Sequence, residues 1–207
     1  MIANSFLARI DRLLADNRRK LLGLLGPPGG RKSTLARALL EAFAGRAVIV
    51  PMDGFHLANS ELARLDRAGR KGAPDTFDSA GYVALLRRLR LQPVGEVIYA
   101  PEYRREIEEG VAGAIAVEPQ IPLVITEGNY LLLEQEHWAQ VREQLDEVWF
   151  VNTDETLRRD RLVQRHIRFG RSPQAAHDWV EQTDEPNAKL IAASRHRADV
   201  QFSWDES

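Results

Sequence analysis

The stretch GPPGGRKST, residues 26–34, decides the fold because of what lies on either side of it. The run LLGLLG, residues 21–26, is typical of a short buried strand, and residues 32–43 carry apolar side chains at helical spacing. A Gly-rich loop between a strand and a helix is typical of a phosphate-binding loop, whose backbone N–H groups surround phosphate oxygens. The alternative, a Gly/Pro turn before an ordinary helix, explains less of this context.

The residues of this loop are expected to bind a nucleotide. Lys32 would contact the β- and γ-phosphates, and the Ser33 hydroxyl would coordinate magnesium. We therefore predict ATP and Mg²⁺ as cofactors, with nucleotide contacts from Gly26, Pro27, Pro28, Gly29, Gly30, Arg31, Lys32, Ser33 and Thr34.

Arg31 departs from the regular motif. The pattern G-x-x-x-x-G-K-[ST] has glycine immediately before the lysine. If that position requires a left-handed backbone, a side chain there costs on the order of 1 kcal/mol. The guanidinium could reach a phosphate, block the pocket or bend the loop away, and we expect a reduced affinity for ATP.

Further apolar runs predict a parallel α/β sheet, because a helix separates the first two of its strands. Three more core strands are expected at residues 47–52, 121–126 and 147–152. Two strands of a small excursion are expected at residues 96–100 and 111–117. The length of 207 residues suits a single domain, 1–207, with a small lid at roughly 155–182.

Two carboxylates follow predicted strands, where open α/β sheets place their reaction centres. Asp53 follows AVIVPM and precedes a polar loop, so we assign it as the base that accepts a substrate hydroxyl proton. Glu127 follows LVIT and is better placed for magnesium. Each could instead cap a neighbouring helix.

An arginine-rich helix is expected at residues 155–169, followed by a helix with Ser172 as N-cap and Pro173 in its first turn. One face of the first helix carries Arg158, Arg161, Arg165 and Arg168. Its apolar residues are few, which predicts a loosely held helix that closes over phosphates. The alternative is a solvated charged face.

The loop after Asp53 contains candidate substrate contacts. His56 follows Asp-Gly-Phe, and Arg70 and Lys71 lie in RKGAPDTFD. These cations could hold an anionic substrate or be exposed loop charges, and the residues alone favour neither.

Composition narrows the partners and the location. The net charge of −2 gives no electrostatic reason to expect nucleic acid or an anionic membrane as partner. The chain has no cysteine, which excludes disulfides and thiol catalysis. No stretch approaches the ~18 apolar residues of a membrane span, and the N-terminus lacks a signal-peptide pattern, so a cytoplasmic location is expected.

Six motifs together resemble the bacterial nucleoside/nucleotide kinase-like P-loop family. They are GPPGGRKSTLA, PMDGFH, RKGAPDTFD, IYAPEY, ITEGNYLLL and RLVQRH, within about residues 21–199. That family is related to uridine kinase, type I pantothenate kinase and phosphoribulokinase, and its members are often labelled fructose transport system kinases. The resemblance implies an α/β P-loop kinase fold, with a five-stranded parallel sheet flanked by helices, and magnesium-dependent phosphoryl transfer from ATP.

The resemblance also implies roles for individual residues. It supports Asp53 as the catalytic carboxylate, Glu127 near magnesium, and Arg161 and Arg165 as lid arginines. The positions that resemble the lining of the acceptor pocket are Arg70, Lys71, Tyr103 and Asn129. Similar kinases are frequently homodimers, and nothing in this sequence decides that state.

The sequence therefore predicts an ATP-dependent kinase that phosphorylates a hydroxyl of a small metabolite, such as a nucleoside, a pantothenate-like molecule or a sugar. The alternative is a nucleotide-binding regulatory module whose catalysis is weak or lost because of Arg31. A GTPase is disfavoured because no N-K-x-D segment is present.

Overall fold

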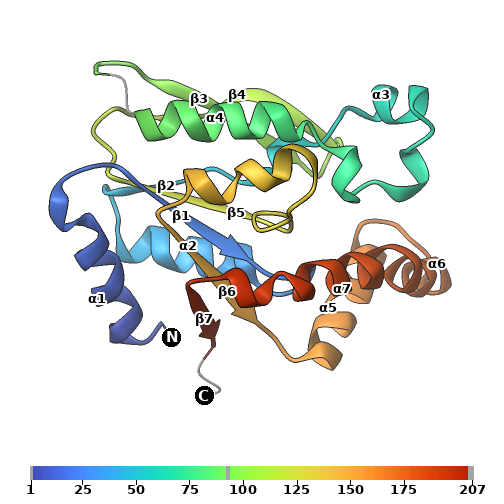
Figure 1. Cartoon of the computed structure of the whole chain (residues 1–207). Coiled ribbons are helices and arrows are strands. Elements are labelled where there is room, and N and C mark those ends of the chain that lie inside the picture. The colour runs from blue at the N-terminus through green and yellow to red at the C-terminus, as the bar shows by residue number, and fades with distance from the viewer. Residues whose placement is uncertain (1, 92–93, 205–207) are drawn as a thin grey trace.

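A sheet of five parallel strands organises the computed structural model, which describes residues 2–91 and 94–204 (Figure 1). The strand order is β2-β5-β1-β6-β7, so the strand before the phosphate loop lies at the centre. This confirms the predicted sheet. The strands are β1 Lys20–Leu25, β2 Ala47–Ile49, β5 Leu123–Gly128, β6 Glu147–Asn152 and β7 Val200–Ser203.

Helices cover both faces of this sheet, as Figure 1 shows. Leu21 and Leu25 of β1 belong to one buried core, whereas Leu22 and Leu24 belong to the other, as the alternation of a strand requires. A strand that is buried on both faces has a continuous apolar sequence. The flanking helices are α4, Ser79–Leu91, on one side and α1, Asn4–Leu13, with α2, Lys32–Ala42, on the other.

A separate two-stranded antiparallel sheet consists of β3, Ile98–Arg104, and β4, Glu109–Val117. This hairpin confirms the excursion predicted from the sequence. It packs against the turn Met52–Phe55, which follows β2. A Cβ atom on Gly54 would lie 2.4 Å from the carbonyl oxygen of Pro101, so only glycine permits this approach.

The remaining helices lie toward one end of the sheet (Figure 1). They are α3, Asn59–Arg64, α5, Glu155–Arg168, α6, Pro173–Trp179, and α7, Glu185–Ala193, with a π-helical turn at Val180–Asp184. α5, α6 and the π-turn share a small core of Leu162, Val163, Ala176 and Val180. Ser172 caps α6 as predicted, because its Oγ accepts a hydrogen bond from the N–H of Ala175 at 3.2 Å.

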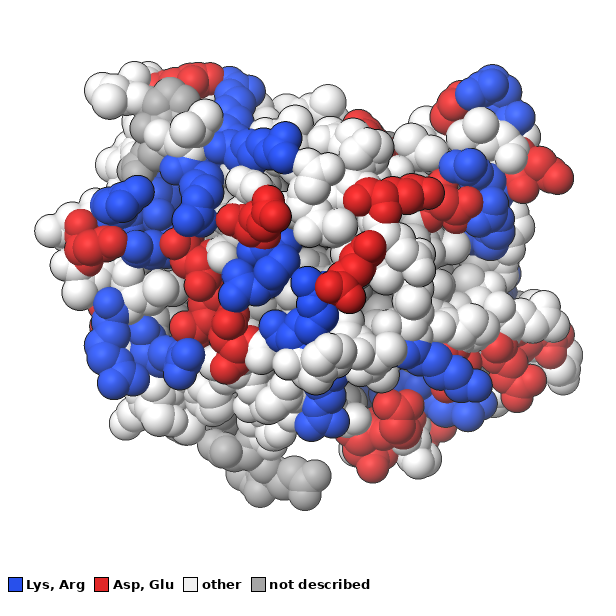
Figure 2. Space-filling model, in the orientation of Figure 1, with Lys and Arg blue, Asp and Glu red and all other residues white. Residues whose placement is uncertain are grey.

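Charged side chains of both signs are intermingled on the face of the molecule shown in Figure 2, in keeping with the small net charge. Within the part of the chain that the structure describes, no helix combines the length and apolar character that a bilayer crossing requires.

Candidate active site

Two adjoining cavities lie beyond the carboxyl ends of the central strands. The smaller one, of about 310 Å³, is lined by residues 28–34 of the phosphate loop. The larger one, of about 510 Å³, is bordered by the loop after Asp53, the β3–β4 hairpin and the α5–α7 segment. The residues that line both cavities are Pro28, Asp53, Arg105, Asn129 and Arg165. This shared border is where groups held in the two cavities would meet.

The phosphate loop has the left-handed turn that the motif requires, although arginine occupies it. Arg31 has φ 65° and ψ 24° and immediately precedes the first residue of α2. Its guanidinium lies 4.5 Å from the ring centre of Trp204. A cation–π contact at an exposed site contributes about 0.5–1 kcal/mol, which is comparable to the backbone cost. The loop thus keeps its left-handed turn with arginine in place of glycine, and the expected loss of ATP affinity remains a prediction.

Lys32 is buried at the start of α2 and is held by two acceptors. Its Nζ donates to Asn129 Oδ1 at 2.8 Å and to the carbonyl oxygen of Pro27 at 3.2 Å. Burial lowers the pKa of Lys32, and the carboxylates of Glu127 and Asp53 act in the opposite direction. A buried ammonium between a loop carbonyl and strand-end groups suits an anionic ligand in the smaller cavity.

Ser33 and Glu127 form the second polar pair of this cavity. Ser33 Oγ donates to Glu127 Oε1 at 2.8 Å, and the glutamate is buried at the end of β5. Burial raises the pKa of Glu127, and the nearby charge of Asp53 raises it further. A bound cation would relieve both effects, so the pair fits magnesium.

Magnesium at this position would rely on few protein ligands. Among the described residues, no group of three or more His, Cys, Asp or Glu side chains could enclose a metal ion. Mg²⁺ commonly keeps several waters and binds through one or two protein groups plus substrate phosphates, and Ser33 and Glu127 suit that kind of site.

Asp53 lies on the turn after β2 and faces both cavities. Its Oδ2 is 3.9 Å from Nη2 of Arg105, a residue of the turn between β3 and β4. The sequence around Arg105 does not mark it as a site residue. Its place depends on how the hairpin packs against residues 52–55, and the run RREIEEG contains no local signal of that packing.

The predicted substrate residues His56, Lys71, Tyr103 and Asn129 all line the larger cavity. The Nδ1–H of His56 donates to the carbonyl oxygen of Asp53 at 2.8 Å, which leaves Nε2 as an acceptor. Burial lowers the pKa of His56 and so favours this neutral form. Lys71 Nζ donates to Asn59 Oδ1 at 2.6 Å and to the carbonyl oxygen of Glu108 at 2.5 Å, so it holds the rim of the cavity together.

Two other predicted residues lie elsewhere. Arg70 pairs with Asp75 on the surface, and Arg161 is exposed on α5. Within the part of the chain that the structure describes, the two cavities are lined by other residues and not by Arg70 or Arg161. Their assigned roles therefore remain predictions without a supporting contact.

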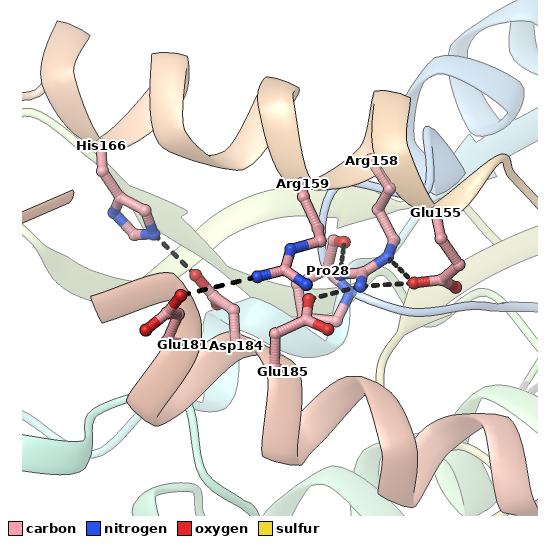
Figure 3. Close-up of polar contacts among 8 residues, drawn as sticks. All are labelled: Pro28, Glu155, Arg158, Arg159, His166, Glu181, Asp184 and Glu185. Carbon is pink, nitrogen blue, oxygen red and sulfur yellow. Dashed lines mark hydrogen bonds and ion pairs between the residues drawn. The ribbon is translucent and has the colours of Figure 1, made fainter. Parts of the chain in front are cut away.

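α5 is anchored to the phosphate loop, as Figure 3 shows. Arg158 is fully buried; its Nη2 donates to Glu155 Oε2 at 2.7 Å and also to Glu185, and its Nη1 donates to the carbonyl oxygen of Pro28 at 3.4 Å. Four residues C-terminal to the exposed Arg161, Arg165 faces both cavities. The expectation of a loosely held helix is wrong for its first half, because ion pairs and burial fix it there. A lid role for residues 155–182 stays a prediction.

Comparison with known proteins places the chain in a family. No family model matches the chain. The "ATP-dependent kinase-like protein notR'" of Aspergillus versicolor is 36% identical over 152 residues, which span 70% of this chain and 88% of that protein. The "Putative uridine kinase C227.14" of Schizosaccharomyces pombe is 35% identical over 185 residues, spanning 85% and 78%. The chain belongs to this ATP-dependent kinase-like family.

Two solved structures have folds similar to that of this chain. The "putative fructose transport system kinase" from Silicibacter sp. TM1040 superposes on this chain with a TM-score of 0.81. The two sequences are 36% identical, and the match covers 89% of this chain and 90% of that one. YFH7 from Saccharomyces cerevisiae, described as a P-loop containing kinase with a circular permutation, gives a TM-score of 0.81 at 18% identity, covering 99% and 100%. The second likeness supports the fold alone. The kinase-like protein therefore has the P-loop kinase fold expected from its motifs.

Proposed function

We propose that the protein transfers the γ-phosphoryl group of ATP to a hydroxyl of a small polar metabolite, a nucleoside, a pantothenate-like molecule or a sugar. The observation that carries this proposal is the position of Asp53 on the border between the phosphate-loop cavity and the larger cavity. A base at that border can accept the proton of a hydroxyl in the larger cavity while that hydroxyl attacks a phosphoryl group held in the smaller one.

In this proposal the smaller cavity positions the phosphate donor. The loop N–H groups and the Lys32 ammonium hold the phosphates, while Ser33 and Glu127 hold magnesium. Bound magnesium would supply charge neutralisation on the phosphate oxygens. Arg165, which reaches the same border from α5, adds a cation there. Positioning and electrostatic stabilisation of this kind account for most of the catalysis in phosphoryl transfer.

The larger cavity binds the acceptor. Its volume of about 510 Å³ suits a small metabolite. Asp53 accepts the proton of the reacting hydroxyl, and Nε2 of His56 offers an acceptor for a second hydroxyl. Both carboxylates and cations line the cavity, among them Glu108, Asp184 and Arg171, which favours a hydroxylated molecule over an apolar one.

A metabolite phosphorylation panel with ATP–Mg tests the proposal. We expect turnover with at least one member of a panel of nucleosides, sugars and pantothenate. Asp53→Asn should lower kcat by roughly 10²–10⁴-fold, the usual contribution of a general base. Asp75→Asn is the matched control, because Asp75 pairs with Arg70 outside both cavities. Equal activity of the two variants would contradict the role of Asp53.

The regulatory alternative rests on the strained conformation of Arg31. It predicts ATP binding by calorimetry without turnover of any panel member, and it predicts that Arg31→Gly restores turnover. Turnover by the native chain at a rate that Arg31→Gly does not raise would reject this alternative.

A further inference from the structure

Arg105 is a cation of the site that belongs neither to the phosphate loop nor to α5. It lies in the turn between β3 and β4 and lines both cavities. Its guanidinium carbon is 5.9 Å from the ring centre of Tyr103, and its Nη2 is 3.9 Å from Asp53 Oδ2. The hairpin therefore delivers a guanidinium to the border where the two cavities meet.

The contact between Arg105 and Asp53 contributes little to the stability of the fold. The two side chains are 41% and 33% exposed, and pairs of this kind contribute about 0–1 kcal/mol. Within the described part of the chain, no hydrogen bond holds the guanidinium of Arg105. The neighbouring Arg104 differs, because its Nε donates to Glu102 Oε2 at 3.1 Å. The N–H donors of Arg105 thus remain available to a ligand.

Arg105 adds a further cation to a border that carries charges of both signs. Burial lowers the pKa of Arg165, and the positive charge of Arg105 lowers it further. Arg105 also lowers the pKa of buried Lys32, whereas the carboxylates of Glu127 and Asp53 raise it. Three cations from three different elements therefore repel one another, and the carboxylates of Asp53 and Glu127 offset part of that repulsion. An anionic group between the cations would offset more of it.

We propose that Arg105 is a second catalytic arginine, which contacts the phosphoryl group during its transfer from the hairpin side while Arg165 does so from α5. This inference rests on the proposed function. The acceptor oxygen forms a bond to the γ-phosphorus as the bond from that phosphorus to the bridging oxygen breaks. The proton passes to Asp53, and ADP leaves with the electron pair. Arg105 forms no covalent bond and stabilises charge on the transferred oxygens.

Kinetics of Arg105→Met, Arg105→Lys and the matched control Arg104→Met test the inference. Loss of a donor to developing charge lowers kcat by roughly 10²–10³-fold, so we expect this effect for Arg105→Met with an acceptor KM within about threefold of the native value. Arg105→Lys should recover only part of the rate, because an ammonium lacks the planar fork. Arg104→Met should behave as the native protein.

A binding measurement separates this inference from the proposed function. The probes are ADP–Mg alone and ADP–Mg with aluminium fluoride, which mimics the transferring phosphoryl group. We expect the native protein to bind the fluoride complex more tightly than ADP–Mg, and Arg105→Met to lose that gain while retaining its affinity for ADP–Mg.

Each remaining outcome is decisive. Equal kcat in Arg105→Met and Arg104→Met, or a raised acceptor KM at unchanged kcat, overturns the catalytic role of Arg105. Native protein with an Arg105-dependent fluoride gain but no turnover on any acceptor overturns only the proposed acceptor class. Native protein with neither turnover nor fluoride gain overturns both.

Discussion

At the scale of single residues, the site concentrates charge that the fold alone would not favour. Glu127 is buried beside Asp53, and Lys32 is buried beside a loop carbonyl. Charged groups in such positions lose solvation that only a bound partner replaces. Residues that bind ligands in this way are expected to lower the stability of the ligand-free protein.

Glu127→Gln should reveal this conflict through the pH dependence of stability. The pKa of Glu127 is raised in the folded state, so the folded protein binds more protons than the unfolded one between the two pKa values. Native stability without metal should therefore fall as pH rises through the raised pKa, and Glu127→Gln should remove that fall. At neutral pH the variant should be more stable than the native protein and far less active.

Urea unfolding in a metal chelator between about pH 4 and pH 8 measures this effect. Addition of magnesium with ADP should then stabilise the native protein more than Glu127→Gln. A variant that is less stable at neutral pH, with a pH profile parallel to that of the native protein, would contradict the interpretation.

At the scale of elements, α5 is joined to the phosphate loop by a buried ionic network. Arg158 connects the first turn of α5 to Glu185 of α7 and to the loop carbonyl of Pro28 (Figure 3). Glu185 is only 17% exposed, so it cannot readily be solvated if its partner is removed. The network therefore connects the phosphate loop to the helix that carries Arg165.

Arg158→Met should destabilise the protein by about 3–5 kcal/mol, the cost of leaving a buried ionic partner unpaired. The double variant Arg158→Met with Glu185→Leu should recover much of that loss, because it removes both charges. Chemical denaturation of the native protein and the three variants, including Glu185→Leu alone, measures the coupling. If the double variant equals the sum of the two single variants, the network contributes nothing as a pair.

Elements whose environment is uniform along the chain are predictable from the sequence. β1, β5 and β6 are buried on both faces and therefore have continuous apolar sequences. The edge strand β7 was not located, because only Phe202 of its four residues is buried. A short strand with one buried residue has no periodic signal to read.

The same distinction applies to the site. Lys32 and Ser33 could be identified because they begin the helix after the loop. Asp53 and Glu127 could be identified because they lie near the carboxyl ends of β2 and β5. Arg105 could not, since tertiary packing of the hairpin brings it to the border. Arg158 and Arg161 are both assigned to one face of the predicted helix. The packing of α5 on the loop buries Arg158 and leaves Arg161 exposed, and the sequence pattern does not distinguish the two.

At the scale of the whole molecule, nucleotide binding should couple to global stability. A ligand at a hundredfold excess over its Kd stabilises the folded state by about 2.7 kcal/mol, which for a chain of this size corresponds to a rise in Tm of roughly 5–11 °C. We expect this rise with ATP–Mg for the native protein and little or none for Lys32→Met. Lys189→Met, a change on α7 outside both cavities as described, is the control and should retain the full shift.

The close approach of Gly54 to Pro101 limits how this scaffold can diversify. Because no larger residue fits at position 54, the strand that carries Tyr103 cannot be displaced without also moving the turn that carries Asp53. Substitutions that change acceptor preference, in evolution or in the laboratory, are therefore least disruptive on the part of the cavity wall that Phe169 and Trp179 form. A library that randomises that wall should yield active enzymes more often than one that remodels the hairpin.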